Sequence, residues 1–380
     1  MKIYFFCGPV GNRKYGGVSI VAERLLFLLK KNNFDTNIIS SSPLFPPKYG
    51  SFERHYIKSV NTIDKLNLKF FLKSIYVFLI NLFRKKELSI DCDGDDVIFI
   101  VNSFIDDDLN KINFTNTRSL KKMCIVHGDV SSFTFQKSSK MTYTEAINDA
   151  KIFLNYFNSI IYISDTTKEN WEKLIKKPSH MLYNSIDEQQ AKKEKNLVDN
   201  LVLKKNKDII DVVLVGSVQD RKGQDILKKI APRFINKCNF HVVGAVSNRW
   251  GGSEIYQSLK DIKNIIFHGY QANPLRFVDA CEIALCVSRS EAFPLTIAEY
   301  LFFGKPIIST NVSGADQMII DNYNGFLVDI DDYVSIVNKL DYIISNPACI
   351  RKFGTNSYHH YYENYSEDIQ EKNFINILNE

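Results

Sequence analysis

Residues 284–310 have the sequence ALCVSRSEAFPLTIAEYLFFGKPIIST, which predicts a strand, a polar loop, a helix and a second strand in succession. The apolar run Ile283–Val287 indicates a buried strand, and Pro306–Ser309 indicates another. Pro294 falls in the first turn of the expected helix, where the missing N–H of proline costs nothing, and Gly304 ends that helix. Such a unit is typical of an open parallel α/β sheet.

This unit carries two carboxylates and a helix N-terminus. Glu291 directly follows a parallel strand, so we expect it in the crevice where open α/β sheets bind ligands, while Glu299 lies in the helix. The first helical turn offers free N–H groups that can bind an anion at the same crevice. These groups are expected near the stretch Phe293, Pro294, Leu295 and Thr296, with Pro294 as the first residue of the helix. The alternative is that Glu291 is an ordinary loop carboxylate and Glu299 a solvated helix residue.

The spacing E-x7-E, with the glycine and proline that follow it, resembles the nucleotide-sugar signature of the retaining glycosyltransferases of family four, which have the GT-B fold. The resemblance extends through most of the chain and implies an α/β protein with two doubly wound Rossmann-like domains facing an interdomain cleft. It implies that Glu291 contacts the donor sugar and that Glu299 holds the ribose hydroxyls. It also places His268–Tyr270 near the nucleotide base, and Asn324–Asp329 resembles a hairpin that closes the donor pocket.

The length of the chain also indicates two domains, because 380 residues exceed what one hydrophobic core usually holds. We expect an N-terminal acceptor-binding domain over residues 1–185, completed by a C-terminal helix over 366–380. A nucleotide-sugar-binding domain is expected over 186–365. Residues 184–187, NSID, resemble the family's crossing between domains, and the polar stretch Glu188–Asp208 predicts a linker with a surface helix.

Two glycine-containing loops are candidates for binding the donor diphosphate. Gly16 and Gly17 precede the first expected helix, where in the family the backbone approaches the phosphates; a plain strand–helix turn is the alternative. A later loop, GSVQDRKG, leads into an expected helix over Gln224–Phe234 and resembles the family segment in which two cations neutralise the diphosphate. Lys222 matches that segment, but Ser217 stands where the family has an arginine, so Arg221 is the candidate for the second cation.

A histidine and two aspartate clusters are further candidates for site residues. His127 follows the expected strand Met123–Val126, and the resemblance implies that it exchanges a hydrogen bond with a donor sugar hydroxyl; a structural histidine is the alternative. Asp91–Asp96 lacks the spaced glutamate of a calcium loop and is expected to be a charged turn, as is Asp106–Asp108. The other histidines lack the spacing of a zinc site, so no metal cofactor is expected.

The first quarter of the chain is basic. Residues 1–90 contain 15 Lys and Arg against five Asp and Glu, which suggests an anionic partner, either phospholipid headgroups or pyrophosphate. Within it, Phe70–Phe83 is an apolar stretch with basic flanks, too short to span a bilayer as a helix. Such a helix can lie in the membrane interface or pack on the N-terminal sheet with its lysines reaching solvent.

Cysteine usage and the N-terminus indicate the compartment. The seven cysteines form no C-x-x-C pair and mostly sit in apolar runs, which predicts buried thiols in a reducing cytoplasm. The first apolar run is too short for a signal-peptide core. We therefore expect a cytoplasmic protein, with peripheral attachment to the inner face of the cell membrane.

Together these patterns predict a retaining glycosyltransferase that moves a sugar, as a hexosyltransferase, from a nucleotide diphosphate sugar to a glycan acceptor. The expected acceptor is linked to polyprenyl pyrophosphate, as in surface polysaccharide or O-antigen synthesis. The nucleotide sugar is a co-substrate, the anionic inner leaflet is a further partner, and no nucleic-acid partner is expected. A sugar-nucleotide epimerase or hydrolase on the same plan is the first alternative. A non-catalytic sugar-binding protein is the second, although such receptors are normally exported.

Overall fold

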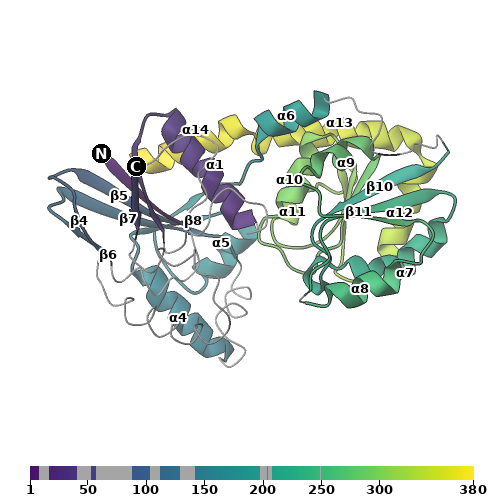
Figure 1. Ribbon diagram of the computed structural model, residues 1–380, viewed down its shortest axis with the longest axis horizontal. Coiled ribbons are helices and arrows are strands. Elements are labelled where there is room, and N and C mark those ends of the chain that lie inside the picture. The colour runs from purple at the N-terminus through teal and green to yellow at the C-terminus, as the bar shows by residue number, and fades with distance from the viewer. Residues whose placement is uncertain are drawn as a thin grey trace, which may run out of the picture. The chain divides into compact units, whose positions relative to one another are not determined.

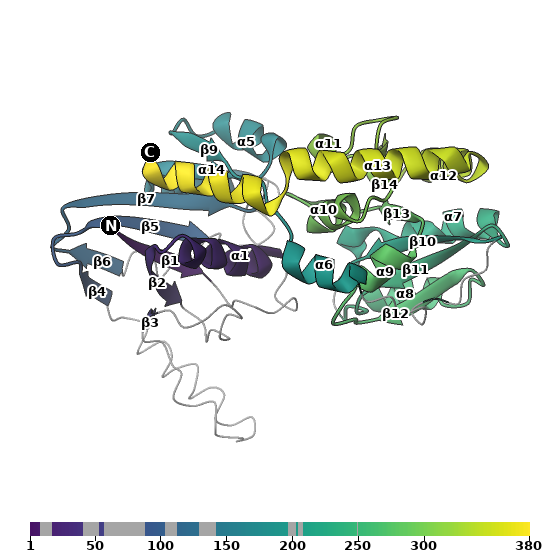
Figure 2. The same cartoon turned by 90° about the horizontal axis from the view of Figure 1, so that it is seen from above.

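The computed structural model describes residues 1–7, 17–40, 53–56, 88–102, 112–128, 142–196, 203, 208–248 and 250–380. The chain divides into two compact units (Figures 1 and 2). The N-terminal unit contains Met1–Tyr162, Lys168–Met181 and Asn376–Glu380, and the C-terminal unit contains Ile163–Thr167 and Leu182–Ile375. The main crossing thus lies between residues 181 and 182, and the last residues of the final helix count with the N-terminal unit.

Among the described residues, the N-terminal unit is built on a seven-stranded parallel sheet of order β3-β2-β1-β5-β7-β8-β9. The strands are β1 Lys2–Cys7, β2 Asp35–Ser40, β3 Glu53–Tyr56, β5 Asp96–Asn102, β7 Ser119–Val126, β8 Ser159–Tyr162 and β9 Ser179–Met181. A separate parallel pair joins β4 Leu88–Asp91 to β6 Ile112–Thr115. The strand order runs outward in both directions from β1 and β5, which is doubly wound topology.

Helices cover this sheet because alternate side chains of each strand face opposite sides. The helices are α1 Gly17–Lys31, α4 Tyr143–Asn155 and α5 Asp165–Glu172. Tyr4, Phe6 and Phe99 are buried with Ala150 and Leu154 of α4 in one core cluster, while α1 packs against β1 and β2. Figure 1 shows α1 above the sheet and α4 below it.

The C-terminal unit has a six-stranded parallel sheet of order β12-β11-β10-β13-β14-β15 in the described part of the chain. Its strands are β10 Ile210–Val215, β11 Cys238–Val243, β12 Ile265–Gly269, β13 Ile283–Cys286, β14 Ile307–Thr310 and β15 Gly325–Val328. The prediction of a hairpin at Asn324–Asp329 is wrong, because β15 pairs in parallel with β14 as the edge strand. The direction of the winding reverses between β10 and β13, and ligands of such sheets bind at that switch point.

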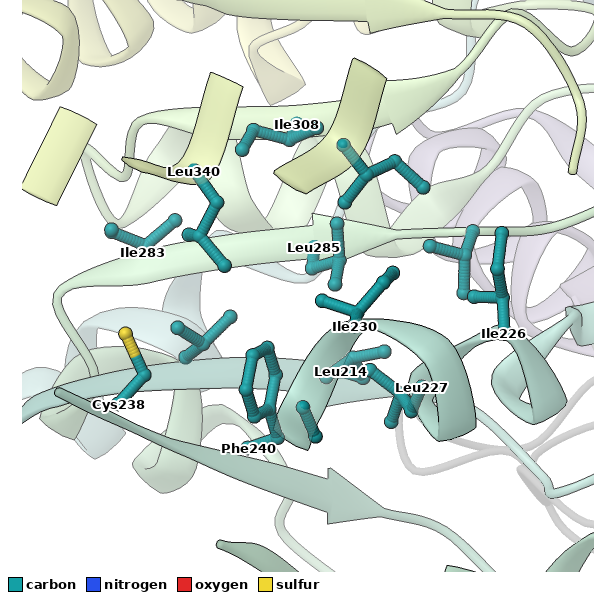
Figure 3. Close-up of a cluster of buried hydrophobic side chains, with 14 of the residues drawn as sticks. Leu214, Ile226, Leu227, Ile230, Cys238, Phe240, Ile283, Leu285, Ile308 and Leu340 are labelled. Carbon is teal, nitrogen blue, oxygen red and sulfur yellow. The ribbon is translucent and has the colours of Figure 1, made fainter. Parts of the chain in front are cut away.

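The helical elements of this unit pack on both faces of the sheet. They are α6 Glu188–Asn196, η3 Asp220–Lys222, η4 Gln224–Ile226, α7 Leu227–Ile230, η5 Ala231–Phe234, α8 Gly252–Leu259, α9 Leu275–Ala280, α10 Leu295–Phe302, α11 Ala315–Met318, α12 Tyr333–Ser345, α13 Pro347–Asn364 and α14 Glu367–Asn379, the last of which ends in the N-terminal unit. Figure 3 shows Leu214 and Leu285 of the strands meeting Leu227, Ile230 and Leu340 of α7 and α12.

Two expected helices differ from the structure. The helix predicted over Gln224–Phe234 is divided into η4, α7 and η5, with Pro232 in the first turn of η5, where it cannot donate an N–H. The helix expected at the surface after the crossing, α6, is packed: Ala191 and Glu188 are buried, and Glu188 accepts hydrogen bonds from Glu367 N (2.9 Å) and Tyr361 Oη (3.3 Å). Hydrogen bonds to a buried glutamate therefore help to hold α6 in place. For this reason the sequence of α6 shows no apolar pattern that would have predicted its packing.

All seven cysteines lie in the described residues and are free thiols; six are buried, and Cys349 on α13 is partly exposed. Burial raises the pKa of Cys7 and of Cys238 to about 12. The prediction of buried thiols is therefore confirmed for six of the seven. Among the described residues, no helix combines the length and the apolar composition needed to cross a membrane. Phe70–Phe83 and Asp106–Asp108 lie outside those ranges.

Candidate active site

Two loops meet at the carboxyl ends of β10 and β13. The loop after β10 contains η3 and ends at Gly223, and the loop after β13 carries Glu291. Arg289 N donates a hydrogen bond to Arg221 O (2.8 Å), which joins the two loops through their backbones. Gly223 has φ +68°, and a Cβ atom there would lie 2.1 Å from Val287 O. Only glycine allows both this left-handed conformation and so close an approach.

Glu291, Arg221 and Lys222 form one ion cluster, here called the Glu291 triad. Lys222 Nζ lies 2.5 Å from Glu291 Oε1, and Arg221 Nη1 lies 3.0 Å from Glu291 Oε2. Ser288 Oγ also donates to Glu291 Oε1 (2.9 Å). The structure thus brings together three residues that the sequence assigned to one site, and it adds Ser288.

The triad keeps Glu291 ionised. Burial by itself would raise the pKa of the Glu291 carboxyl, but the charges of Lys222 and Arg221 and the hydrogen bonds from Lys222 and Ser288 hold it below its ordinary value. The Lys222 side chain is 15% exposed and that of Arg221 is 48% exposed. Arg221 is therefore open to a ligand even while it contacts Glu291.

Arg289 braces the two loops beside the triad. Its guanidinium donates to both oxygens of Asp225 (2.8 and 2.7 Å) and to Asp331 Oδ1 (2.9 Å), and it also donates to Asp220 O (2.7 Å). Bidentate contacts of this kind fix planar geometry as well as charge. Arg289 thereby ties the loop after β13 to the residue that precedes Arg221.

The helix α10 begins one residue later than the sequence predicts. Pro294 is its N-cap, with φ −71° and ψ 96°, and Leu295 and Thr296 form the first turn, where N–H groups lack helical acceptors. Phe293 does not offer its side chain to a ligand, because its ring stacks on Tyr183 (6.3 Å between ring centroids) and meets Tyr365 edge-on (6.0 Å). The side chain of Phe293 therefore anchors the loop that carries Glu291.

Comparison with known proteins agrees with this architecture. Residues 196–360 match the family model described as "Glycosyl transferases group 1". An uncharacterized glycosyltransferase of Methanocaldococcus jannaschii is 24% identical over 349 residues, which cover 90% of this chain and 88% of that protein. The crystal structure of HepE from Anabaena in complex with UDP and glucose has a TM-score of 0.68 at 15% identity and covers 100% of this chain and 99% of that one. The fold is GT-B.

A further solved structure extends the likeness. The apo form of the lipopolysaccharide outer core galactosyltransferase WaaB has a TM-score of 0.65 at 18% identity, with 100% of this chain and 99% of that one covered. The matched family model and the relatives together support a GT-B glycosyltransferase.

Glu299 lies in α10 and is buried, 7% exposed, rather than a solvated helix residue. It is not a member of the Glu291 triad, and its contact with ribose hydroxyls stays a prediction. The next residue, Tyr300, is fully buried, and its hydroxyl accepts a hydrogen bond from Val215 N (2.9 Å) at the end of β10. Tyr300 therefore fills the space beside the end of β10, next to the loop that carries Lys222.

His127 follows β7 in the N-terminal unit. Asn102 Nδ2 donates to Val18 O (3.3 Å), so Asn102 Oδ1 faces His127 and accepts from its Nε2–H at 2.7 Å. The other ring nitrogen, Nδ1, is then a hydrogen-bond acceptor. Burial lowers the pKa of His127 to about 4, so the ring is neutral at physiological pH. A neutral acceptor suits a sugar hydroxyl, and that role stays a prediction.

Only one glycine of the expected pair lies in the described residues. Gly17 is the first residue of α1, and Gly16 lies outside the described ranges. The cluster Asp91–Asp96 is a turn between β4 and β5, and its carboxylates have protein partners. Asp96 contacts Arg118 and accepts from Ser119 Oγ (2.7 Å), while Lys2 Nζ lies 3.0 Å from Asp95. In the described residues, no group of three or more His, Cys, Asp or Glu could hold a metal.

Proposed function

We propose that this chain is a retaining glycosyltransferase, a hexosyltransferase, that moves a sugar from a nucleotide diphosphate sugar to a glycan acceptor. The Glu291 triad is the observation that carries the proposal. Its two cations and one carboxylate leave one positive charge in excess, beside the first turn of α10. A diphosphate is attracted to that charge, while ionised Glu291 can accept a hydrogen bond from a donor sugar hydroxyl.

The chemistry follows from this arrangement. The bond between the anomeric carbon and the phosphate oxygen breaks, and its electron pair leaves with the diphosphate. Lys222, Arg221 and the N–H groups of α10 stabilise that charge as it develops. The acceptor hydroxyl oxygen attacks the anomeric carbon from the same face and gives its proton to the leaving phosphate, which retains the configuration. In this scheme side-chain cations do the work of a metal, and we expect no metal cofactor.

We also propose a class of acceptor and a location. The acceptor is a glycan linked to polyprenyl pyrophosphate, at the cytoplasmic inner leaflet, in surface polysaccharide or O-antigen assembly. The basic composition of residues 1–90 supports an anionic membrane surface as partner. The likeness to a lipopolysaccharide galactosyltransferase and to HepE in complex with UDP and glucose supports a sugar donor of this kind.

The test is sugar transfer from a panel of UDP- and GDP-sugars, with and without lipid-linked glycan acceptors, comparing wild type with Glu291→Gln. We expect Glu291→Gln to lose transfer by about 100-fold or more, because the substitution keeps size but removes a charged contact to the donor. Glu254→Gln, at an exposed position on α8, is the matched control and should be unaffected. Activity of Glu291→Gln within about tenfold of wild type would reject the assignment.

Two further arms separate the alternatives. Free sugar or an epimerised donor formed without acceptor would favour the hydrolase or epimerase instead. Excess chelator should leave the transfer rate nearly unchanged, whereas complete inhibition that manganese reverses would contradict the metal-free scheme.

A further inference from the structure

Two aromatic side chains are exposed at the carboxyl edge of the C-terminal sheet. Trp250, in the loop between β11 and α8, is 63% exposed, and Tyr270, directly after β12, is 53% exposed. The two loops start side by side, because Gly244 N donates to Gly269 O (2.9 Å). Large aromatic rings gain free energy when they are covered, and exposed ones beside a ligand site commonly contact the ligand.

The backbone of Trp250 is held in an unusual conformation next to the Glu291 triad. Its φ is +55°, in the left-handed region that bulky L residues rarely adopt. Trp250 O accepts a hydrogen bond from Asp220 N (2.9 Å), and a Cβ atom on Gly251 would lie 2.2 Å from Asp220 Oδ1. The loop is therefore locked onto the residue before Arg221. A strained residue kept in place beside a functional loop is a reason to look for function.

The order of the strands in the C-terminal sheet indicates in which direction the nucleoside extends from the Glu291 triad. The Glu291 triad lies at the boundary of β10 and β13, whereas Trp250 and Tyr270 follow β11 and β12, on the other side of β10. A nucleotide sugar is linear, with the diphosphate between the sugar and the nucleoside. If the sugar is at Glu291 and the diphosphate at Arg221 and Lys222, the nucleoside extends toward β11 and β12. This step rests on the function proposed above.

We propose that Trp250 stacks on the base of the donor nucleotide and so forms the nucleoside end of the donor site. Stacking suits this position because every base presents a flat π face, which an indole covers without selecting hydrogen-bonding groups. Tyr270 borders the same end of the site. Trp250 thus contributes to donor affinity through the nucleoside, separately from the diphosphate contacts of the triad.

The tryptophan content of the chain makes the test direct. The chain has two tryptophans, and both lie in the described residues. Trp171 is fully buried and its Nε1 donates to Gly128 O (2.9 Å), so acrylamide quenching of fluorescence reports on Trp250. The probes are UDP, GDP, inorganic pyrophosphate and glucose. We expect a nucleoside diphosphate to protect Trp250 from acrylamide, and pyrophosphate or glucose alone to leave it accessible.

Affinities from calorimetry complete the experiment. Trp250→Ala should bind the nucleoside diphosphate about tenfold or more weakly, Trp250→Phe should keep most of the affinity, and pyrophosphate affinity should not change in either. Tyr342→Ala, at an exposed position on α12, is the control and should behave as wild type.

The contrary outcomes are distinct. If a nucleoside diphosphate binds wild type but leaves Trp250 accessible, the inference is wrong while the proposed function stands. Equal losses for pyrophosphate and nucleoside diphosphate in Trp250→Ala would show that Trp250 only shapes the loop. Protection by glucose or a glycan alone would assign Trp250 to the acceptor instead. If no nucleoside diphosphate binds wild type, the proposed function itself fails, and this inference with it.

Discussion

At the scale of single residues, Glu291 is held in place before any ligand arrives. Lys222 and Ser288 fix one carboxylate oxygen and Arg221 fixes the other, so the charges that a donor would meet are already oriented. Preorganised charges of this kind stabilise a developing anion without a cost of reorientation during the reaction. The same contacts mean that loss of any one partner should disturb the other two.

His127 gives a prediction about stability and pH. Its pKa is about 4 in the folded protein and ordinarily about 6.5, so between these values the unfolded chain binds a proton that the folded chain does not. The free energy of unfolding should therefore fall as pH falls from about 6.5 to 4, by at most about 1.4 kcal/mol per pH unit from this one group. Urea unfolding at pH 7 and pH 5 should show a smaller loss for His127→Gln than for wild type.

The control for this measurement is His359→Gln, because His359 is exposed. It should keep the pH dependence of wild type. His268, whose pKa burial also lowers to about 4, adds a similar contribution that both variants retain. Identical losses in wild type and His127→Gln would contradict the assignment.

At the scale of elements, the site depends on how closely the loops after β10 and β13 approach each other. Replacing Gly223 by alanine should strain the left-handed backbone and also drive Cβ into Val287 O. Gly94→Ala is the matched control, because Gly94 has φ +78° and a Cβ atom there would meet nothing within 4 Å. We expect Gly94→Ala to lose about 1–2 kcal/mol of unfolding free energy, and Gly223→Ala to lose more.

The two substitutions should also differ in donor binding. Gly223→Ala displaces the loop that carries Arg221 and Lys222, so donor affinity should fall, whereas Gly94→Ala lies in a turn of the N-terminal unit and should leave it unchanged. Chemical unfolding and nucleotide calorimetry measure the two effects. Equal destabilisation by both substitutions would show that the contact with Val287 is easily relieved.

The sequence predicted the strands better than the contacts between loops. β13, predicted over Ile283–Val287, spans Ile283–Cys286, and β14, predicted over Pro306–Ser309, spans Ile307–Thr310, because burial between two layers of helices requires apolar runs. Arg289 pairs with Asp225 and Asp331, which lie far from it in sequence. No rule of sequence spacing predicts pairs of this kind. Likewise Phe293 was predicted to contribute only its backbone to an anion site, and nothing in the sequence indicated that its ring packs on Tyr183 and Tyr365. A parallel β15 was missed because a glycine-led apolar run suits a hairpin equally well.

At the scale of the whole molecule, the uneven charge predicts reversible association with anionic membranes through the basic N-terminal region. Six cations lie within or beside Phe70–Phe83, and each contributes about 1 kcal/mol close to an anionic surface, so together they supply roughly 4–6 kcal/mol. That suffices for attachment but not for permanent insertion, and salt should weaken it. Co-sedimentation with anionic liposomes at low and high salt measures the effect.

A charge-removal variant is the control for this association. It replaces Lys69, Lys73, Arg84, Lys85 and Lys86 together and should sediment less than wild type at low salt. If the wild-type protein does not co-sediment with anionic liposomes at low salt, a soluble acceptor becomes the better hypothesis. Replacing Phe78 and Leu79 by serine tests the alternative, a helix packed on the N-terminal sheet. If the helix is packed there, the two substitutions should destabilise the whole protein.

The burial of six cysteines also makes the native chain a convenient substrate for covalent labelling. A thiol reacts with maleimides as the thiolate, and buried thiols with raised pKa values are slow to form it. Cys349, partly exposed on α13, should therefore take up a fluorophore or spin label first, without any engineered cysteine. Brief treatment with N-ethylmaleimide should give one adduct by intact mass, and Cys349→Ser should give none. A probe placed there would report on the C-terminal unit of the unaltered protein.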